Sequence, residues 1–188
     1  LLLTLRGTPT LYYGDELGMR DAVILPEQIQ DPQGKNIGVS RDPARTPMQW
    51  SPTANAGFTR GTPWLPLGHD YQQCNVAQQA EQADSLLSLY RRLIALRRKE
   101  PALSVGSYRP IVAGPDLLAF VREADTGPRF LVALNLGPEP IAVVRRPRPC
   151  KVLEHHFPEA RAVTVAAARI AGDEHVHRKR PPNGRRPG

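Results

Sequence analysis

The character of the sequence changes at Pro101, and this change restricts the folds that the chain can adopt. Before Pro101, apolar residues recur at three- and four-residue spacing from about Asp84, and basic residues gather toward Lys99. This pattern predicts an amphipathic helix over 84–99 that is capped by Asp84 and stopped by Pro101. After Pro101, short apolar runs separated by turn residues predict strands over 106–111, 117–122, 130–136, 141–144, 151–153 and 162–165. We therefore expect α/β structure followed by a small antiparallel β domain.

The residues before this helix predict a helix end, one strand and a long loop. The apolar run 1–5 has no capping residue ahead of it, so we expect the chain to begin inside a helix, as a truncated sequence would. Residues 10–13 are apolar and aromatic and follow a Gly-Thr-Pro turn, which predicts a buried strand. Residues 18–67 hold many Pro and Gly and predict a loop with short helical pieces. We expect this loop to be ordered by apolar anchors, namely Met48, Trp50, Phe58 and Trp64.

Composition narrows the partners that we expect. The net charge is +7, but the basic excess lies in Pro-rich stretches at 145–148 and after residue 171, without aromatic residues to stack on bases. No nucleic-acid partner is therefore expected. No apolar run approaches the ~20 residues of a membrane span, and no export signal is visible, so no membrane partner is expected either. Cys74 and Cys150 have no His or Cys at metal-ligand spacing, which favours reduced thiols and a cytoplasmic protein.

Two long segments resemble the α-amylase superfamily. The sequence RGTPTLYYGDELGM at residues 6–19 looks like the last barrel strand of these enzymes with its following loop. The sequence RDPARTPMQW at residues 41–50 resembles a signature of the α-glucosidase branch, close to the oligo-1,6-glucosidases. Shorter similarities follow in the same order, so that the resemblance covers roughly residues 1–145. It implies a glycosidase of carbohydrate metabolism, built as a TIM-type (β/α)8 barrel that is followed by a β-sandwich.

This resemblance implies a division of the chain. Residues 1–100 are expected to be the C-terminal end of the catalytic barrel, with a long loop over 18–83, and residues 101–170 the C-terminal β domain. A whole barrel takes about 250 residues, so only the last strand-helix unit of the barrel is expected here. Residues 171–188 lack an apolar pattern and are expected to form a disordered basic tail. The sequence also departs from the family after Ala166, where the last strands of a sandwich would stand.

No catalytic residue is expected in this chain. Hydrolysis with retention, which the resemblance implies, needs two carboxyl groups about 5–5.5 Å apart. Asp15 and Glu16 are the only paired acids near the expected site, and neighbours in an extended chain point to opposite sides. In the family the essential carboxylates lie on earlier barrel strands, so the chain is expected to be inactive alone.

Four charged residues are candidates for lining a sugar pocket: Asp15, Glu16, Arg41 and Arg45. Carboxylate and guanidinium groups can hydrogen-bond to sugar hydroxyls. The alternative for the two acids is a solvated or capping pair, and the alternative for the two arginines is that they pin the loop through carboxylate or carbonyl contacts. Four aromatic residues either stack on sugar rings or simply pack, namely Tyr12, Tyr13, Trp50 and Trp64.

No metal site and no cofactor are expected. The histidines lack the spacing of metal ligands and are expected at the surface, namely His69, His155, His156, His175 and His177. The glycines at 14 and 18 lack the Lys-Ser/Thr of a phosphate-binding loop.

Three functions stay open at this point. The first is the C-terminal portion of an α-glucosidase that hydrolyses terminal α-linked glucose from oligosaccharides. The second is a noncatalytic carbohydrate-binding or complementing module, and the third is a basic protein that binds through its tail. Sugar-isomerising enzymes share the resemblance, and the linkage preference cannot be read from these residues.

Overall fold

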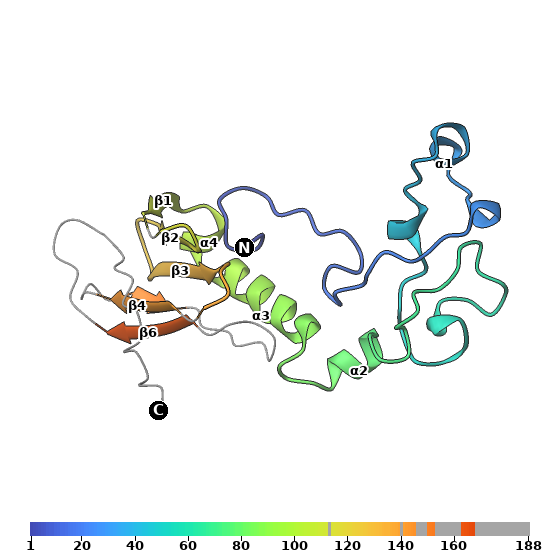
Figure 1. The fold of residues 1–188 in the computed structure, drawn as a ribbon. Coiled ribbons are helices and arrows are strands. Elements are labelled where there is room, and N and C mark those ends of the chain that lie inside the picture. Colours follow the sequence, from blue (N-terminus) through green and yellow to red (C-terminus); the bar gives the residue numbers. More distant parts are fainter. Residues whose placement is uncertain (113, 140, 146–149, 153–162, 168–188) are drawn as a thin grey trace, which may run out of the picture. The chain divides into compact units, whose positions relative to one another are not determined.

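The computed structural model describes residues 1–112, 114–139, 141–145, 150–152 and 163–167 (Figure 1). Contacts divide the chain into two units. We call Thr10–Arg92 the loop unit, and Leu1–Pro9 together with Leu93–Gly188 the sheet unit. The expected tail over 171–188, and the four histidines at 155, 156, 175 and 177, lie outside the described residues. The predicted domain boundaries remain predictions.

The loop unit consists of short helices joined by turns, as the Pro- and Gly-rich sequence predicts. Three of these helices begin with a proline in their first turn, where the missing N–H group costs nothing. Asp31 and Asn75 each cap a helix by accepting a backbone hydrogen bond. The elements in order are η1 Pro26–Gln28, α1 Pro32–Ile37, η2 Asp42–Arg45, η3 Ala54–Gly57 and α2 Val76–Ala80.

The strand predicted over residues 10–13 does not form. Residues 13–18 make successive turns, in which Asp15 N donates to Tyr12 O at 3.1 Å and Leu17 N to Gly14 O at 3.0 Å. The Tyr12 and Tyr13 side chains are exposed rather than buried. A strand needs a neighbour to complete its ladder of hydrogen bonds. No strand among the described residues pairs with this segment. The expected helix end at residues 1–5 is a single turn, closed by Leu5 N and Leu1 O at 3.2 Å.

Three of the four predicted anchors of the loop unit are wrong, because Trp50, Phe58 and Trp64 are exposed and only Met48 is buried. Met48 packs with Leu17 and Leu87 in a small apolar cluster. Leu65 is also buried, but many of the other buried side chains in this unit are polar, among them Asp31, Asp42, Gln49 and Asn75. Hydrogen bonds within the loop therefore take the place of the predicted apolar anchors.

Helix α3, Leu86–Lys99, confirms the amphipathic helix of the sequence prediction. Its cap is Ser85 rather than Asp84, because Ser88 N donates to Ser85 Oγ at 3.1 Å while the Asp84 side chain is exposed. The helix ends before Pro101, as predicted, and Pro101 then begins the short helix α4, Pro101–Ser104.

The strands confirm the sequence prediction to within two residues at each end. They are β1 Ser107–Ile111, β2 Leu117–Glu123, β3 Arg129–Asn135, β4 Ile141–Arg145, β5 Cys150–Val152 and β6 Val163–Ala167. The first three form an antiparallel sheet. The antiparallel prediction is wrong for the others, since β5 pairs with β3 in parallel and β4 pairs with β6 in parallel. Alternating apolar residues mark a strand but carry no information on its direction.

The antiparallel sheet has apolar side chains on both faces. One face carries an alternating set on β1, β2 and β3, which packs with Ile141: Ile111, Leu117, Ala119, Val121 and Leu131. On the other face Phe130 packs against Ala102 and Leu103 of α4. This double burial explains the nearly continuous apolar sequence of β2 and β3.

Two buried arginines attach residues 1–7 to the rest of the sheet unit. Arg122, fully buried on β2, donates to Thr4 O, Ser107 O and Gly106 O at 2.6, 3.0 and 3.1 Å. Arg97 on α3 donates to Leu3 O at 3.1 Å and Leu5 O at 2.9 Å. Burial, and then the nearby Arg97 and Arg6 charges, lower the pKa of Arg122. Main-chain carbonyls of the first turn thus solvate two buried charges.

Candidate functional site

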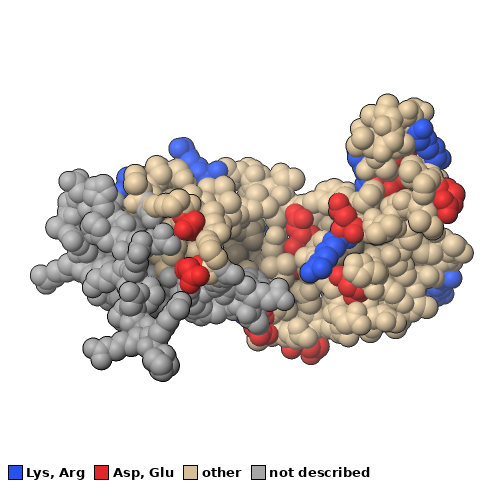
Figure 2. Space-filling model, in the orientation of Figure 1, with Lys and Arg blue, Asp and Glu red and all other residues tan. Residues whose placement is uncertain are grey.

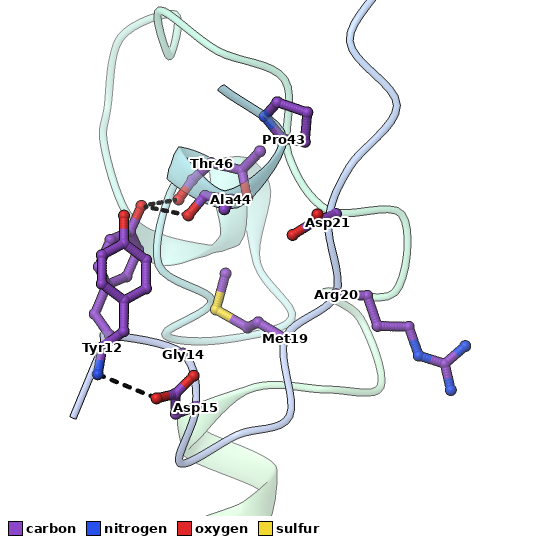
Figure 3. Close-up of a pocket in the computed structure, with 10 residues that line it drawn as sticks. Tyr12, Gly14, Asp15, Met19, Arg20, Asp21, Pro43, Ala44 and Thr46 are labelled. Carbon is purple, nitrogen blue, oxygen red and sulfur yellow. Dashed lines mark hydrogen bonds between the residues drawn. The ribbon is translucent and has the colours of Figure 1, made fainter. Parts of the chain in front are cut away.

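Two segments of the loop unit line a half-open cavity of about 130 Å³ (Figure 3). The first segment contributes residues between Tyr12 and Asp21, and the second contributes Pro43, Ala44 and Thr46. The segments are joined by hydrogen bonds from Tyr13 Oη to Thr46 O at 3.0 Å and from Ala22 N to Pro43 O at 3.1 Å. The two stretches that carry the sequence resemblance therefore lie side by side and form the first and the second wall of this cavity.

The turn that forms the first wall depends on Gly14. Its φ of +92° lies in the left-handed region, and a Cβ there would stand 2.9 Å from Met19 Sδ. Asp15 Oδ2 accepts from Tyr12 N at 3.1 Å, and Glu16 Oε2 accepts from Gly14 N at 2.9 Å. Both acids thus bind amides of their own turn, which is the capping arrangement raised as an alternative.

Asp15 and Glu16 lie in a turn and not in the extended chain that the sequence predicted, so that prediction is wrong. Asp15 lines the cavity, whereas Glu16 does not. Tyr90 of α3 lies close to both acids: burial, and then the charges of Asp15 and Glu16, raise the pKa of its hydroxyl. The sequence placed Tyr90 on the apolar face of a helix and gave no signal of this neighbourhood.

The candidate residues Arg41 and Arg45 belong to the stretch that forms the second wall, but neither of them lines the cavity. Arg41 forms a two-pronged ion pair with Asp31, in which Nη2 lies 2.6 Å from Oδ1 and Nε lies 2.8 Å from Oδ2. The guanidinium of Arg41 holds the pKa of Asp31 well below its usual range. Arg45 lies near Tyr13, whose pKa is raised by burial and by Tyr12 and is lowered in part by Arg45. Arg41 thus pins the loop, which was its alternative role, and a part in sugar binding remains a prediction.

Arg20 and Asp21 also line the cavity, and the sequence interpretation missed them. The Asp21 carboxylate turns toward the second wall in Figure 3, whereas the Arg20 side chain points away from it. Their only signal in the sequence is their place directly after the turn. Asp21 therefore joins Asp15 as a polar group of the cavity.

The described residues outside this cavity contain no cluster of metal-ligating side chains. On the face that Figure 2 shows, Lys and Arg side chains of the described residues are scattered among acidic ones. No group of three or more His, Cys, Asp or Glu within the described ranges could hold a metal ion. None of the described helices is long and apolar enough to cross a bilayer.

Comparisons with known proteins agree on one family. A model of the α-amylase catalytic domain matches residues 1–106. The trehalose synthase/amylase of Mycobacterium tuberculosis is 40% identical over 153 residues, which make up 75% of this chain and 23% of that protein. The oligo-1,6-glucosidase of Heyndrickxia coagulans is 35% identical over 159 residues, or 73% of this chain and 28% of that protein.

A solved structure is similar over most of the chain. The trehalulose synthase of Pseudomonas mesoacidophila matches with a TM-score of 0.69 and 34% identity, covering 88% of this chain and 34% of that one. Of the two curated relatives, the trehalose synthase/amylase and the oligo-1,6-glucosidase, the chain spans only about a quarter of the length.

Proposed function

This chain belongs to the α-amylase family, and from that premise we propose that it is the C-terminal portion of an α-glucosidase. The proposed reaction releases terminal α-linked glucose from oligosaccharides with retention of configuration. In this proposal the chain supplies one wall of the sugar pocket. The carboxyl groups that cleave the glycosidic bond belong to barrel strands upstream of Leu1, so the isolated chain is inactive.

The cavity between the two walls is the observation that carries this proposal. Its lining combines the carboxylates of Asp15 and Asp21 with the rings of Tyr12 and Tyr13. Carboxylates accept hydrogen bonds from sugar hydroxyls, and aromatic faces suit the apolar faces of a pyranose. Tyr13 is held by its hydrogen bond to Thr46 O, so its ring has a fixed place in the wall.

The engagement of Asp15 and Glu16 supports a separate origin for the catalytic pair. Each carboxylate already accepts a hydrogen bond from a backbone amide of its own turn. A retaining pair needs one nucleophile and one acid/base that face each other across the same bond. Two acids that cap one turn do not provide that arrangement.

The experiment is to express the chain together with the coding sequence upstream of Leu1 and to assay hydrolysis of p-nitrophenyl α-glucoside. We expect turnover, with α-glucose as the first product in NMR spectra of the reaction. Arg41→Gln is expected to raise KM in this longer protein, whereas Asp125→Asn, in an exposed turn of the sheet unit, leaves KM unchanged. A stop codon and a start codon directly before Leu1, or a folded longer protein without turnover, would contradict the proposal.

A second candidate is a noncatalytic carbohydrate-binding or complementing module. The exposed aromatic side chains of the loop unit favour it, because Trp50 is 50% and Trp64 66% accessible. Mixing the chain with a separately expressed upstream part distinguishes the two: regained hydrolysis supports a complementing module, and no association removes it.

The proposed location of the protein is the cytoplasm. This proposal rests on cysteine usage, and Cys74 carries a free thiol.

A further inference from the structure

The carboxylate of Asp31 makes most of its hydrogen bonds with Arg41. Oδ2 accepts from the backbone N of Arg41 at 2.9 Å and from its Nε at 2.8 Å, while Oδ1 accepts from Nη2 at 2.6 Å. Oδ1 also caps α1 by accepting from Gln33 N at 3.2 Å. Backbone and side chain of Arg41 are therefore fixed by the same acid.

A second carboxylate fixes Asp31 itself. Asp42, which follows Arg41, is buried, and its Oδ2 accepts from Gln30 N at 2.7 Å and from Asp31 N at 2.9 Å. The ends of the segment 31–41, which contains α1, are thus held together by these hydrogen bonds (Figure 1). The carboxylates of Asp31 and Asp42 therefore join the two ends of this segment.

The two partners of the ion pair differ in exposure. The Asp31 side chain is 0% accessible, whereas that of Arg41 is 54% accessible. Asp31 occupies the Nε and Nη2 edge of the guanidinium, and Nη1 has no partner among the described residues. A planar guanidinium held along one edge presents its remaining N–H groups in a fixed direction. The pair therefore has a buried acid and an open, oriented donor.

Arg41 lies two residues before Pro43, at the start of the stretch that contributes Pro43, Ala44 and Thr46 to the cavity. We propose, on the basis of the proposed function, that Asp31 is a positioning residue for sugar binding. It holds the Arg41 guanidinium so that the Nη1 hydrogens meet sugar hydroxyls. Without Asp31, a long and flexible side chain has to be ordered by the ligand itself, which weakens binding.

The test is a double-mutant cycle on the 188-residue chain, with maltose and isomaltose as probes. Binding is followed by NMR through the Arg41 Nε–H signal and through backbone amides of residues 12–21. We expect Asp31→Asn to weaken binding about fivefold, as loss of preorganisation of one long side chain does. Arg41→Gln weakens binding by as much or more, and Asp31→Asn then has no additional effect in the Arg41→Gln background. Asp125→Asn is the matched control, an acid in an exposed turn, and leaves binding unchanged.

A purely structural role of Asp31 gives a different result. In that case Asp31→Asn weakens binding equally in both backgrounds, and this outcome overturns the proposal. If Asp31→Asn fails to fold, Arg41→Lys is the second variant. It keeps the positive charge and leaves the Asp31 cap of α1 in place, but a lysine cannot form the bidentate contact with Asp31. It is therefore expected to weaken binding as Arg41→Gln does. Unchanged binding in Arg41→Lys, or an Arg41 Nε–H signal that neither probe moves, also overturns the proposal.

The outcome is separable from that of the proposed function. If the longer protein hydrolyses p-nitrophenyl α-glucoside while the cycle shows no coupling, only the positioning role fails. If the cycle shows coupling and the longer protein is inactive, the chain binds sugar through Arg41 without being part of an α-glucosidase.

Discussion

The antiparallel sheet and the loop unit are ordered by different kinds of buried side chain. Strands β1, β2 and β3 bury an alternating apolar set together with Phe130. The loop unit buries a small apolar cluster around Met48, and polar side chains stand beside Leu65 among its largest fully buried ones, namely Gln49, Asn75 and Asp42. Two polar atoms there, Asp42 Oδ1 and Gln49 Oε1, are buried without a partner among the described residues.

The two regions obtain their shapes in different ways. Apolar burial is non-directional, so it stabilises a regular sheet without fixing individual contacts. Hydrogen bonds are directional, so a buried carboxylate or amide can fix an irregular segment residue by residue. The cavity walls and Arg41 lie in the second kind of region. The proposed binding site, which needs oriented donors, thus lies where polar groups set the geometry.

The largest expected effect is on the sheet. Phe130→Ala removes a fully buried ring from the contact with α4 and is expected to cost about 4 kcal/mol of the free energy of unfolding. Hydrogen exchange of the β2 and β3 amides measures this loss locally. Leu136→Ala, at an exposed position just after β3, is the control and changes the exchange little. Exchange free energies within about 1 kcal/mol of the unaltered chain would show that Phe130 does not support the sheet.

The next effect concerns the polar order of the loop unit. Asn75 is fully buried, accepts from Gln78 N at 3.0 Å and donates to Tyr71 O at 2.9 Å. Asn75→Ala removes the cap of α2 and is expected to destabilise the loop unit by about 2 kcal/mol, measured from hydrogen exchange of residues 70–80. Gln78→Ala, an exposed side chain in the same helix, serves as the control. If both variants exchange alike, the polar contacts of Asn75 do not hold the loop.

Much of the fold follows from the sequence, and the reasons for success and failure are physical. The strands and α3 were predictable because Leu117, Ala119 and Val121 report their burial by spacing within one segment. The strand over residues 10–13 failed because a ladder depends on a partner elsewhere. Asp31 and Asp42 escaped notice because a carboxylate that binds amides ten or more residues away leaves no period in the sequence. The motifs did locate both cavity walls, but not the residues Arg20, Asp21 and Tyr90.

A smaller effect should appear with pH. The Arg41 guanidinium lowers the pKa of Asp31; for Asp42, burial raises the pKa, but hydrogen bonds from Asp31 N and Gln30 N outweigh it, and the pKa is lowered. A lowered pKa in the folded state stabilises above the unfolded value of about 3.9, and the contribution is lost as the pH falls toward the folded value. Amides of residues 30–42 should keep their protection from pH 7 to about 5 and lose it below about 4. Protection that grows on acidification would contradict this assignment.

The smallest expected effect is at the exposed aromatic residues. Trp64→Ala removes a ring that is mostly accessible, so the free energy of unfolding should change by less than about 0.5 kcal/mol. Thermal unfolding followed by circular dichroism measures it, with Met48→Ala as the buried comparison from the same unit. A loss at Trp64 as large as that at Met48 would restore the predicted apolar anchoring of the loop.

The most direct test of the account is an activity assay on the 188-residue chain itself with p-nitrophenyl α-glucoside. We proposed that the chain supplies one wall of a sugar pocket, and its paired acids cap a turn, so we expect no release of p-nitrophenol above the blank. Measurable turnover that disappears in Asp15→Asn or Glu16→Gln would contradict it and place the catalytic groups within this chain.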